Sequence, residues 1–242
     1  MTKIPKIIHY CWFGRGEMPE LVQNCIASWH TYMPDWKYRL WMEDNFDIES
    51  APAYVQEAYA AKKYAFVSDY VRLWALEREG GLYMDVDFEV YKPFDDLMDQ
   101  YDAFAGYEGS KKNPVMMGVI ASKAHHSWIQ GMKETYVDRK FVKENGSLDM
   151  KPNTGYFFDW MTLQGFVGDG VEKDWNGVHI LSVECFCPRL TTGENLRCNR
   201  TYCEHKGLHS WSGDGGWKAK VLNVCSPRIK TMLIKLKRRI LK

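Results

Sequence analysis

The stretch YAFVSDYVRLWALEREGGLYMDVDFEVYKP, from Tyr64 to Pro93, determines the fold expected for this chain. It predicts a helix with Ser68 as its N-cap and Gly80-Gly81 at its end. Serine side chains cap helix starts, and glycine readily takes the left-handed conformation that follows a helix. A short apolar strand comes next and ends in the acidic sequence DVD. We therefore expect a helix and a strand that together position these acids.

Acidic side chains dominate the end of this stretch. Residues two apart on an extended chain share a face, so Asp85, Asp87 and Glu89 are expected on one side and core residues on the other. Carboxylates roughly 6.6 Å apart along a strand can hold a hard divalent ion and leave positions for phosphate oxygens. The preceding helix adds Asp69 and Arg72, which lie three apart and are neighbours on one face. A turn and a surface ion pair are the ordinary alternatives.

As a whole, the segment SDYVRLWALEREGGLYMDVDFEVYKP is more specific than its parts. It closely resembles the DxD-containing region of glycosyltransferase family 32, which includes bacterial capsule and lipopolysaccharide enzymes and fungal mannosyltransferases. It is also similar to the clostridial glucosylating toxins. The resemblance implies a GT-A fold, an α/β, Rossmann-like architecture with a mostly parallel mixed sheet flanked by helices. It also implies a nucleotide-sugar donor, Mn²⁺ or Mg²⁺ as cofactor, and retention of the anomeric configuration.

Length and composition indicate one folded domain. The chain has 242 residues, of which 45% are hydrophobic and 14% aromatic, and this suits an α/β domain with a sizeable core. The seven cysteines are odd in number in a chain too long to need disulfides, which favours a reducing compartment. The N-terminus lacks an apolar signal segment, and no run approaches the ~18 apolar residues that span a bilayer. We expect a cytoplasmic protein.

Charge is unevenly distributed along the chain. Residues 226–242, SPRIKTMLIKLKRRILK, hold seven of the 32 Lys and Arg and none of the 31 acids. We therefore divide the chain into a glycosyltransferase domain, 1–225, and a basic tail, 226–242. The tail is expected to form an amphipathic helix that binds the inner face of an anionic membrane, with a helix packed on the body as the alternative. The acidic body argues against nucleic acid as a partner.

The first strand is expected over Lys6–Trp12, within IPKIIHYCWFG at 4–14. Ligands bind at the carboxyl ends of strands in α/β sheets, so Trp12 is expected at the mouth of the cleft. The segment is similar to the family's opening motif, whose Trp stacks on the nucleotide base, and the resemblance assigns that role to Trp12. A core Trp near a turn is the alternative. His9 is expected to be a buried strand histidine.

Two later segments resemble further family motifs. Asn153, in the N-T-G sequence at 153–155, matches a turn near the donor sugar and acceptor, although a helix cap explains it equally well. TYCEHKGLHSW, 201–211, resembles a motif in which a His before Ser-Trp completes the metal site. The match implies His205 as a metal ligand, with His209 as second choice. It places Ser210 and Trp211 on the phosphate side of the cleft.

Periodicity predicts the remaining elements. Helices are expected over residues 18–32, 47–62 and 123–137, with a short one at Asp95-Asp96, and strands over 38–41, 102–107, 116–122 and 180–183. In the first helix the expected buried face consists of Leu21, Cys25, Ile26 and Trp29.

The sequence thus predicts a metal-dependent, retaining glycosyltransferase. The expected metal ligands are Asp85, Asp87 and His205, and the expected donor-binding residues are Trp12, Asp69, Arg72, Tyr83, Ser210 and Trp211. Asp85, Asp87 and Asn153 are the expected catalytic residues. The donor is expected to be UDP-galactose, with GDP-mannose, UDP-glucose or UDP-N-acetylglucosamine as alternatives. The acceptor is expected to be a glycan or lipid-linked oligosaccharide of a bacterial surface polysaccharide.

Two other classes remain open at this point. A phosphotransferase or phosphatase would use its first aspartate as nucleophile, but Glu89 stands where such motifs carry Thr or Val. A non-catalytic sugar- or zinc-binding module is the other class. Zinc would use the thiolates of Cys185, Cys187, Cys198 and Cys203, whose spacing lacks the C-x-x-C pairs of typical sites. The alternative for these thiols is packing.

Overall fold

The computed structural model describes residues 4–109, 114–190 and 192–207. The helices are α1 Glu20–Tyr32, α2 Ala53–Ala60, α3 Tyr64–Glu79, α4 Asp95–Gln100, α5 Ser127–Glu134, α6 Asn153–Leu163 and α7 Val183–Phe186. The strands are β1 Ile7–Cys11, β2 Lys37–Trp41, β3 Gly81–Met84, β4 Phe88–Val90, β5 Ala103–Tyr107, β6 Val115–Ser122, β7 Lys173–Trp175, β8 Val178–Leu181 and β9 Cys203–His205. His209, Ser210, Trp211 and the tail 226–242 lie outside the described residues, and the domain boundary at 225 stays a prediction.

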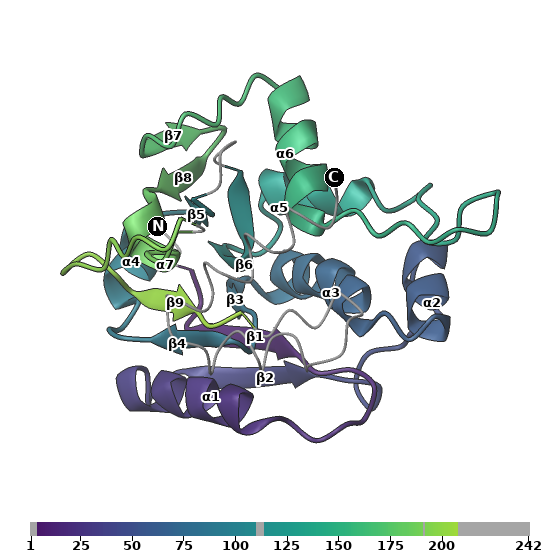
Figure 1. The fold of residues 1–242 in the computed structure, drawn as a ribbon, viewed down its shortest axis with the longest axis horizontal. Coiled ribbons are helices and arrows are strands. Elements are labelled where there is room, and N and C mark those ends of the chain that lie inside the picture. The colour runs from purple at the N-terminus through teal and green to yellow at the C-terminus, as the bar shows by residue number, and fades with distance from the viewer. Residues whose placement is uncertain (1–3, 110–113, 191, 208–242) are drawn as a thin grey trace, which may run out of the picture. The chain divides into compact units, whose positions relative to one another are not determined.

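Seven strands form one sheet in the order β2-β1-β3-β6-β5-β8-β7, with helices on both faces (Figure 1). The pairs β1-β2, β1-β3 and β5-β8 are parallel, whereas β3-β6, β5-β6 and β7-β8 are antiparallel. The prediction of an α/β fold with a mixed sheet flanked by helices is confirmed. Parallel and antiparallel pairs are equally numerous, because β6 runs against both of its neighbours and β7 runs against β8, so the prediction of a mostly parallel sheet was wrong.

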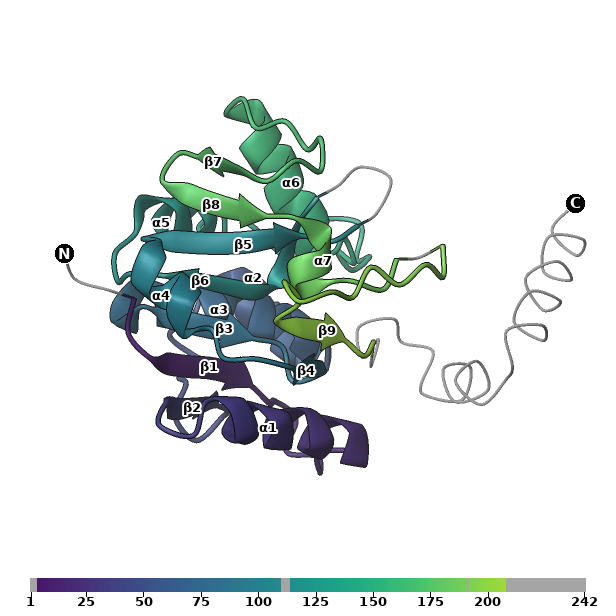
Figure 2. The same cartoon turned by 90° about the vertical axis from the view of Figure 1, so that its left-hand side faces the viewer.

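Strand alternation distributes the core over the two faces of the sheet. In β3, Tyr83 packs on one face, and Leu82 and Met84 pack on the other. The first face is covered by residues of α2, α3, α5 and α6, and the second by residues of α1, α4 and α7. The two-stranded sheet of β4 and β9 packs on the second face and is seen near the ends of β1, β5 and β8 (Figure 2).

Helix α3 is longer than the sequence predicted. It begins at Tyr64, and Ser68 lies inside it with its hydroxyl donating to the Tyr64 carbonyl at 3.2 Å, so the prediction of Ser68 as N-cap was wrong. An additional turn forms because Phe66 and Val67 are both buried in the core. The C-terminal prediction is confirmed, since Gly80 has a φ of 63° and its N–H donates to the Leu76 carbonyl.

The single strand expected through DVDFEV is also wrong. β3 ends at Met84, and the Asp85 carbonyl accepts a hydrogen bond from the Phe88 N–H at 3.2 Å, which turns the chain. Phe88 then starts β4, which pairs with the distant strand β9 rather than with the large sheet. The burial of Phe88 and Val90 in the core is as predicted. The acids therefore bracket a turn between two sheets.

His9 is a buried strand histidine, as predicted. Its Nδ1 accepts from the Trp41 indole N–H at 3.2 Å, and its Nε2 lies 2.9 Å from the Gly80 carbonyl. Burial lowers the pKa of His9, so the ring is neutral and Nε2 carries the proton. The contact joins β1 and β2 to the end of α3.

Most other predicted elements are present with shifted ends. The helix at 47–62 is reduced to α2, and that at 123–137 to α5. In α1 the buried residues are Val22, Cys25 and Trp29, whereas Leu21 is 36% exposed, so the assignment of Leu21 to the core was wrong.

Candidate functional site

A buried guanidinium organises the first part of the candidate site. Nη2 of Arg72 lies 2.7 Å from Oδ1 of Asp69 and 3.3 Å from Oδ1 of Asp85. Its Nη1 donates to the Met117 carbonyl at 2.5 Å. The Arg72 side chain is only 5% exposed, so the pairing with Asp69 is buried rather than a surface ion pair. One cation thus links α3 to the end of β3 and to β6.

Tyr83 fixes Asp85 from the same face of the sheet. Its hydroxyl donates to Oδ1 of Asp85 at 2.7 Å, and the Arg72 guanidinium lies 4.6 Å from the centre of its ring. Burial raises the pKa of Asp85, the positive charge of Arg72 opposes this, and the negative charge of Asp87 adds to it. Asp85 is therefore an oriented carboxylate that depends on Arg72 for its ionisation.

Asp69 and Asn153 meet beside this network. Burial raises the pKa of Asp69 to about 6, despite the opposing charge of Arg72. Asn153 is the first residue of α6 and is only 6% exposed. The cap is Pro152, and Asn153 makes no capping bond, so the interpretation of Asn153 as a helix cap was wrong. The Asn153 amide instead acts on Asp69, where it opposes the rise in pKa that burial causes.

Asp87 and His205 form the second part of the site. Nε2 of His205 lies 3.0 Å from Oδ2 of Asp87, across 118 residues of sequence. In the pairing of β4 with β9, His205 stands opposite Phe88, and its ring stacks on that of Phe88 at 4.8 Å. Burial would lower the pKa of His205, but the hydrogen bond and the charge of Asp87 raise it above its usual value. Asp87 and His205, both predicted as metal ligands, are therefore in contact, while their role towards a metal stays a prediction.

An ionic network that the sequence did not reveal holds β9 in this register. Glu89 and Glu204 stand opposite each other in β4 and β9, where like charges repel. Lys206 lies between them, 2.6 Å from Oε2 of Glu89 and 3.6 Å from Oε1 of Glu204. The Tyr91 hydroxyl contacts Oε2 of Glu89 at 2.8 Å and of Glu204 at 3.2 Å. No motif marks these residues, because they meet only when β9 pairs with β4.

The predicted metal ligands fit a divalent ion by their chemistry. Two carboxylates and an imidazole, from Asp85, Asp87 and His205, suit Mn²⁺ or Mg²⁺ better than a sulfur-binding metal. A Cβ at Gly118 would lie 2.8 Å from Oδ2 of Asp85, so the missing side chain makes room for that carboxylate. Within the described part of the chain, no three His, Cys, Asp or Glu side chains are already grouped around one point. A bound ion would draw Asp85 and the Asp87–His205 pair together.

Gly118→Ala tests the space beside Asp85. The new methyl group would also lie 2.8 Å from Cε2 of Phe88, so both the acid and the start of β4 must shift. We expect donor turnover to fall by roughly 100-fold, the size of loss that follows a misplacement of about 1 Å. The urea concentration at the midpoint of unfolding should change little by comparison with the loss of turnover. Activity equal to that of the wild type would show that Asp85 needs no such room.

The remaining predicted residues are only partly covered by the structure. Trp12 follows β1 at its carboxyl end and is half-buried, and its indole N–H donates to the Gly16 carbonyl at 2.6 Å. Its position at the carboxyl end of the first strand is as predicted, while its place at a cleft and its role towards a nucleotide stay predictions. The roles of His209, Ser210 and Trp211 also stay predictions, since these residues are outside the described ranges.

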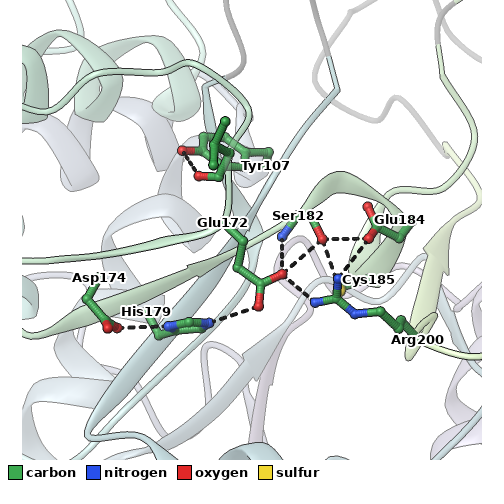
Figure 3. Close-up of polar contacts among 9 residues, drawn as sticks. Tyr107, Glu172, Asp174, His179, Ser182, Glu184, Cys185 and Arg200 are labelled. Carbon is green, nitrogen blue, oxygen red and sulfur yellow. Dashed lines mark hydrogen bonds and ion pairs between the residues drawn. The ribbon is translucent and has the colours of Figure 1, made fainter.

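A second polar cluster joins β7, β8, α7 and the segment before β9 (Figure 3). Glu172 accepts from the guanidinium of Arg200 and from the hydroxyl of Ser182 at 3.1 Å, and lies 3.3 Å from Nε2 of His179. Arg200 also donates to Glu184 at 3.1 Å. These groups satisfy one another, so the cluster fastens the segment that leads to β9.

The cysteines near this segment are packing residues. Cys185, Cys187 and Cys203 are buried. Burial raises the pKa of Cys185 to about 11 and of Cys187 to about 12, so both thiols are protonated at neutral pH. In the described ranges these thiols do not gather into a group of three or more ligands, so the alternative of packing is favoured over the thiolate zinc site considered above.

Comparison with known proteins agrees with the resemblance found in the sequence. Residues 19–104 match the family model described as "Glycosyltransferase sugar-binding region containing DXD motif". This segment contains the acids Asp69, Asp85 and Asp87 together with Arg72. The recognition from residues 68–93 is thereby confirmed.

Individual relatives cover different parts of the chain. It is 32% identical to inositol phosphoceramide mannosyltransferase 1 of Schizosaccharomyces pombe over 108 residues, 40% of this chain and 32% of that protein. The chain thus spans about a third of that relative's length. It is 24% identical to an uncharacterized glycosyltransferase of Acanthamoeba polyphaga mimivirus over 225 residues, covering 86% and 84% of the two chains.

Solved structures of two glycosyltransferases also align with the chain. PaToxG glycosyltransferase has 18% identity and a TM-score of 0.49, with 67% of this chain and 71% of that chain covered. The galactosyltransferase LgtC, in complex with donor and acceptor sugar analogues, has 13% identity and a TM-score of 0.45, with 82% and 86% covered.

Proposed function

We propose, from the premise that residues 19–104 are the DXD-containing sugar-binding region of a glycosyltransferase, that this chain transfers a hexose from a nucleotide sugar to a glycan. The fold we propose for it is of the GT-A type, and the reaction retains the anomeric configuration. One observation supports the proposal most strongly: the segment that matches the family model also contains a buried polar network. The network consists of Asp69, Arg72, Tyr83 and Asp85. A structural ion pair would need neither a tyrosine donor to Asp85 nor a nearby Asp87–His205 pair.

In this proposal one set of residues acts on the leaving diphosphate, and other residues bind the donor sugar and the base. Asp85, Asp87 and His205 would hold a divalent ion, which supplies positive charge opposite the departing diphosphate. Asp69 and Arg72 would bind donor-sugar hydroxyls. Tyr83 keeps Asp85 oriented through its hydrogen bond. Trp12 would stack on the base, Asn153 would face the reacting sugar, and Ser210 and Trp211 would line the phosphate side.

The proposed reaction is a front-side substitution. The acceptor hydroxyl forms the new bond to the anomeric carbon as the bond to the diphosphate breaks. The electron pair of the broken bond stays on the diphosphate, and a phosphate oxygen of that leaving group takes the acceptor proton. The chain then needs no covalent sugar intermediate, and its task is to orient both substrates and exclude water.

The proposed donor is UDP-galactose, with UDP-glucose and UDP-N-acetylglucosamine as alternatives. GDP-mannose is a second candidate because one relative is named a mannosyltransferase. As acceptor we propose a glycan or lipid-linked oligosaccharide of a bacterial surface polysaccharide.

A donor panel tests this function. The full chain would be incubated with each of these four nucleotide sugars in Mn²⁺ or in excess EDTA, and release of UDP or GDP would be measured. We expect one donor to be hydrolysed with Mn²⁺ and none with EDTA. Hydrolysis that EDTA leaves unchanged would contradict the metal-dependent reaction, and no hydrolysis of any donor would contradict the transferase.

We also propose that the protein is cytoplasmic and that residues 226–242 attach it to an anionic membrane. None of the helices the structure describes is long and apolar enough to cross a bilayer. Deleting residues 228–242 should release the protein from vesicles that contain phosphatidylserine, because about 1 kcal/mol of attraction is lost per basic residue. Co-sedimentation measures this. Equal sedimentation of the deleted and full chains would contradict the anchor.

A further inference from the structure

Two buried polar side chains near Asp69 have no hydrogen-bond partner. Both amide atoms of Asn153 and the hydroxyl of Tyr136 are unpaired among the described residues. Asn153 is 6% exposed and Tyr136 1% exposed, so bulk solvent does not reach them. Burying a polar group without a partner destabilises a fold, and native proteins contain few such atoms. These atoms therefore point to a polar ligand.

Asp69 is the common neighbour of these two groups. Burial raises the pKa of Asp69, and the nearby Asn153 amide opposes this rise. The charge of Asp69 in turn raises the pKa of Tyr136, after the larger effect of burial, while the charges of Arg139 and Arg72 lower it. The Tyr136 ring packs at 5.3 Å on that of Tyr70, the residue after Asp69, and at 6.3 Å on that of Phe157, one helical turn after Asn153. A carboxylate acceptor, an amide with donor and acceptor atoms, and a phenol that can do both are thus close together. Each partner of a sugar hydroxyl must be one of these kinds.

Arg139 contacts Tyr136 and the helix that begins with Asn153. Its guanidinium lies 4.4 Å from the ring centre of Tyr54, 4.5 Å from that of Tyr136 and 3.8 Å from that of Tyr156. Such contacts with aromatic faces stabilise a cation that is largely removed from water, and Arg139 is only 15% exposed. This cage of three rings around Arg139 therefore joins the segment after α5 to α2 and to the first turn of α6.

Asp149 closes this cage on the side of α6. Oδ2 of Asp149 lies 3.8 Å from Nη2 of Arg139 and accepts from the Tyr156 hydroxyl at 2.5 Å. Tyr156 is three residues after Asn153 in the same helix. The cage thus fixes the start of α6, and with it the direction of the Asn153 side chain.

We propose that Tyr136 is a donor-sugar contact of this enzyme and that Arg139 is a positioning residue, the two completing a hydroxyl-binding wall with Asp69 and Asn153. This inference rests on the proposed function and extends it to residues outside the matched segment 19–104. The ligand is the uncharged, hydroxyl-rich part of the nucleotide sugar. The nucleotide and diphosphate are bound elsewhere, by the residues around Asp87.

Tyr136→Phe tests the direct contact, because it removes one oxygen and keeps the ring that packs on Tyr54 and Phe157. Affinities of the full chain in Mn²⁺ would be measured by calorimetry for UDP-galactose and GDP-mannose and for UDP and GDP alone. We expect sugar-nucleotide affinity to fall about tenfold, or about 1.4 kcal/mol, which is within the range found for one buried hydrogen bond. Affinity for the nucleotide alone should not change.

Tyr70→Phe is the matched control. Tyr70 lies in α3, and its ring packs on that of Tyr136 at 5.3 Å. Tyr70 directly follows Asp69 in α3, so the two side chains leave the helix about 100° apart. This variant should bind sugar nucleotides as the wild type does.

Arg139→Lys tests the positioning role. Lysine keeps the charge but lacks the planar group that fits between three rings. We expect the same selective loss of sugar-nucleotide affinity, with thermal unfolding recorded alongside.

The outcomes separate the two proposals. If wild-type protein binds a sugar nucleotide differently from its nucleotide and Tyr136→Phe preserves that difference, the wall holds only water and the inference is overturned. If wild-type protein binds no nucleotide or sugar nucleotide, the proposed function and this inference both fail.

Discussion

Asp87→Asn is expected to reduce metal-dependent hydrolysis of the donor by roughly 100-fold or more, because it weakens the hold on the ion proposed to oppose the charge of the departing diphosphate, and one such preorganised group contributes this much to turnover. The amide keeps the size of the carboxylate but loses its charge. Both the attraction for a divalent ion and the ion pair with His205, at 3.0 Å, are weakened. Release of UDP or GDP at saturating Mn²⁺ measures the effect.

The fold should tolerate this change. Asparagine can still hydrogen-bond to His205, and β9 is independently held by Lys206 between Glu89 and Glu204. The urea midpoint of Asp87→Asn should therefore lie close to that of the wild type. Asp35→Asn, at an exposed position, is the control for loss of one negative charge. Turnover of Asp87→Asn equal to that of the control would reject Asp87 as a ligand.

Arg72→Met is expected to abolish activity and to destabilise the fold by about 3–5 kcal/mol, the range found when one partner of a buried ion pair is removed. Methionine fills much of the arginine volume but leaves the carboxylates of Asp69 and Asp85 without their cation. It also leaves the Met117 carbonyl without its donor. The free energy of unfolding in urea measures the loss. Arg72→Lys keeps the charge and should lose less stability.

This destabilisation should depend on pH in a defined direction. Burial already raises the pKa of Asp69 from 3.8 to about 6 with Arg72 present, and removal of Arg72 raises it further. A carboxyl whose folded-state pKa exceeds its unfolded value costs most stability above the folded pKa, and the cost disappears as pH falls towards 3.8. Arg72→Met should therefore be less destabilising at pH 5 than at pH 8. A constant difference would show that lost charge pairing is not the cause.

The local part of the site was predictable from the sequence. Asp69 and Arg72 are three apart on one helix, and Tyr83 and Asp85 are two apart at the end of a strand, so their pairing follows from helix and strand periodicity. Burial of Arg72 was not predictable from the residues nearby. Its hydrogen bond to the Met117 carbonyl forms only because β6 lies antiparallel to β3.

The turn after β3 shows where periodicity stopped being informative. Alternation in DVDFEV correctly predicted that Phe88 and Val90 are buried, but it could not show that they belong to a different sheet from Met84. That separation is set by pairing with β9, more than a hundred residues later, and a strand of three residues has little pattern of its own. Tyr136 and Arg139 carried no recognisable motif either, since their role depends on packing against α2 and α6.

The small sheet of β4 and β9 has a consequence for how the protein acquires its active form. The contact of Arg72 with Asp85 closes a loop of 13 residues, whereas that of His205 with Asp87 closes one of 118. Contacts between distant residues carry a larger loop-closure entropy and tend to form later during folding. We therefore expect the contact of Arg72 with Asp85 to form early and the pair of Asp87 and His205 to form last, so an incompletely folded molecule would lack the complete set of proposed metal ligands.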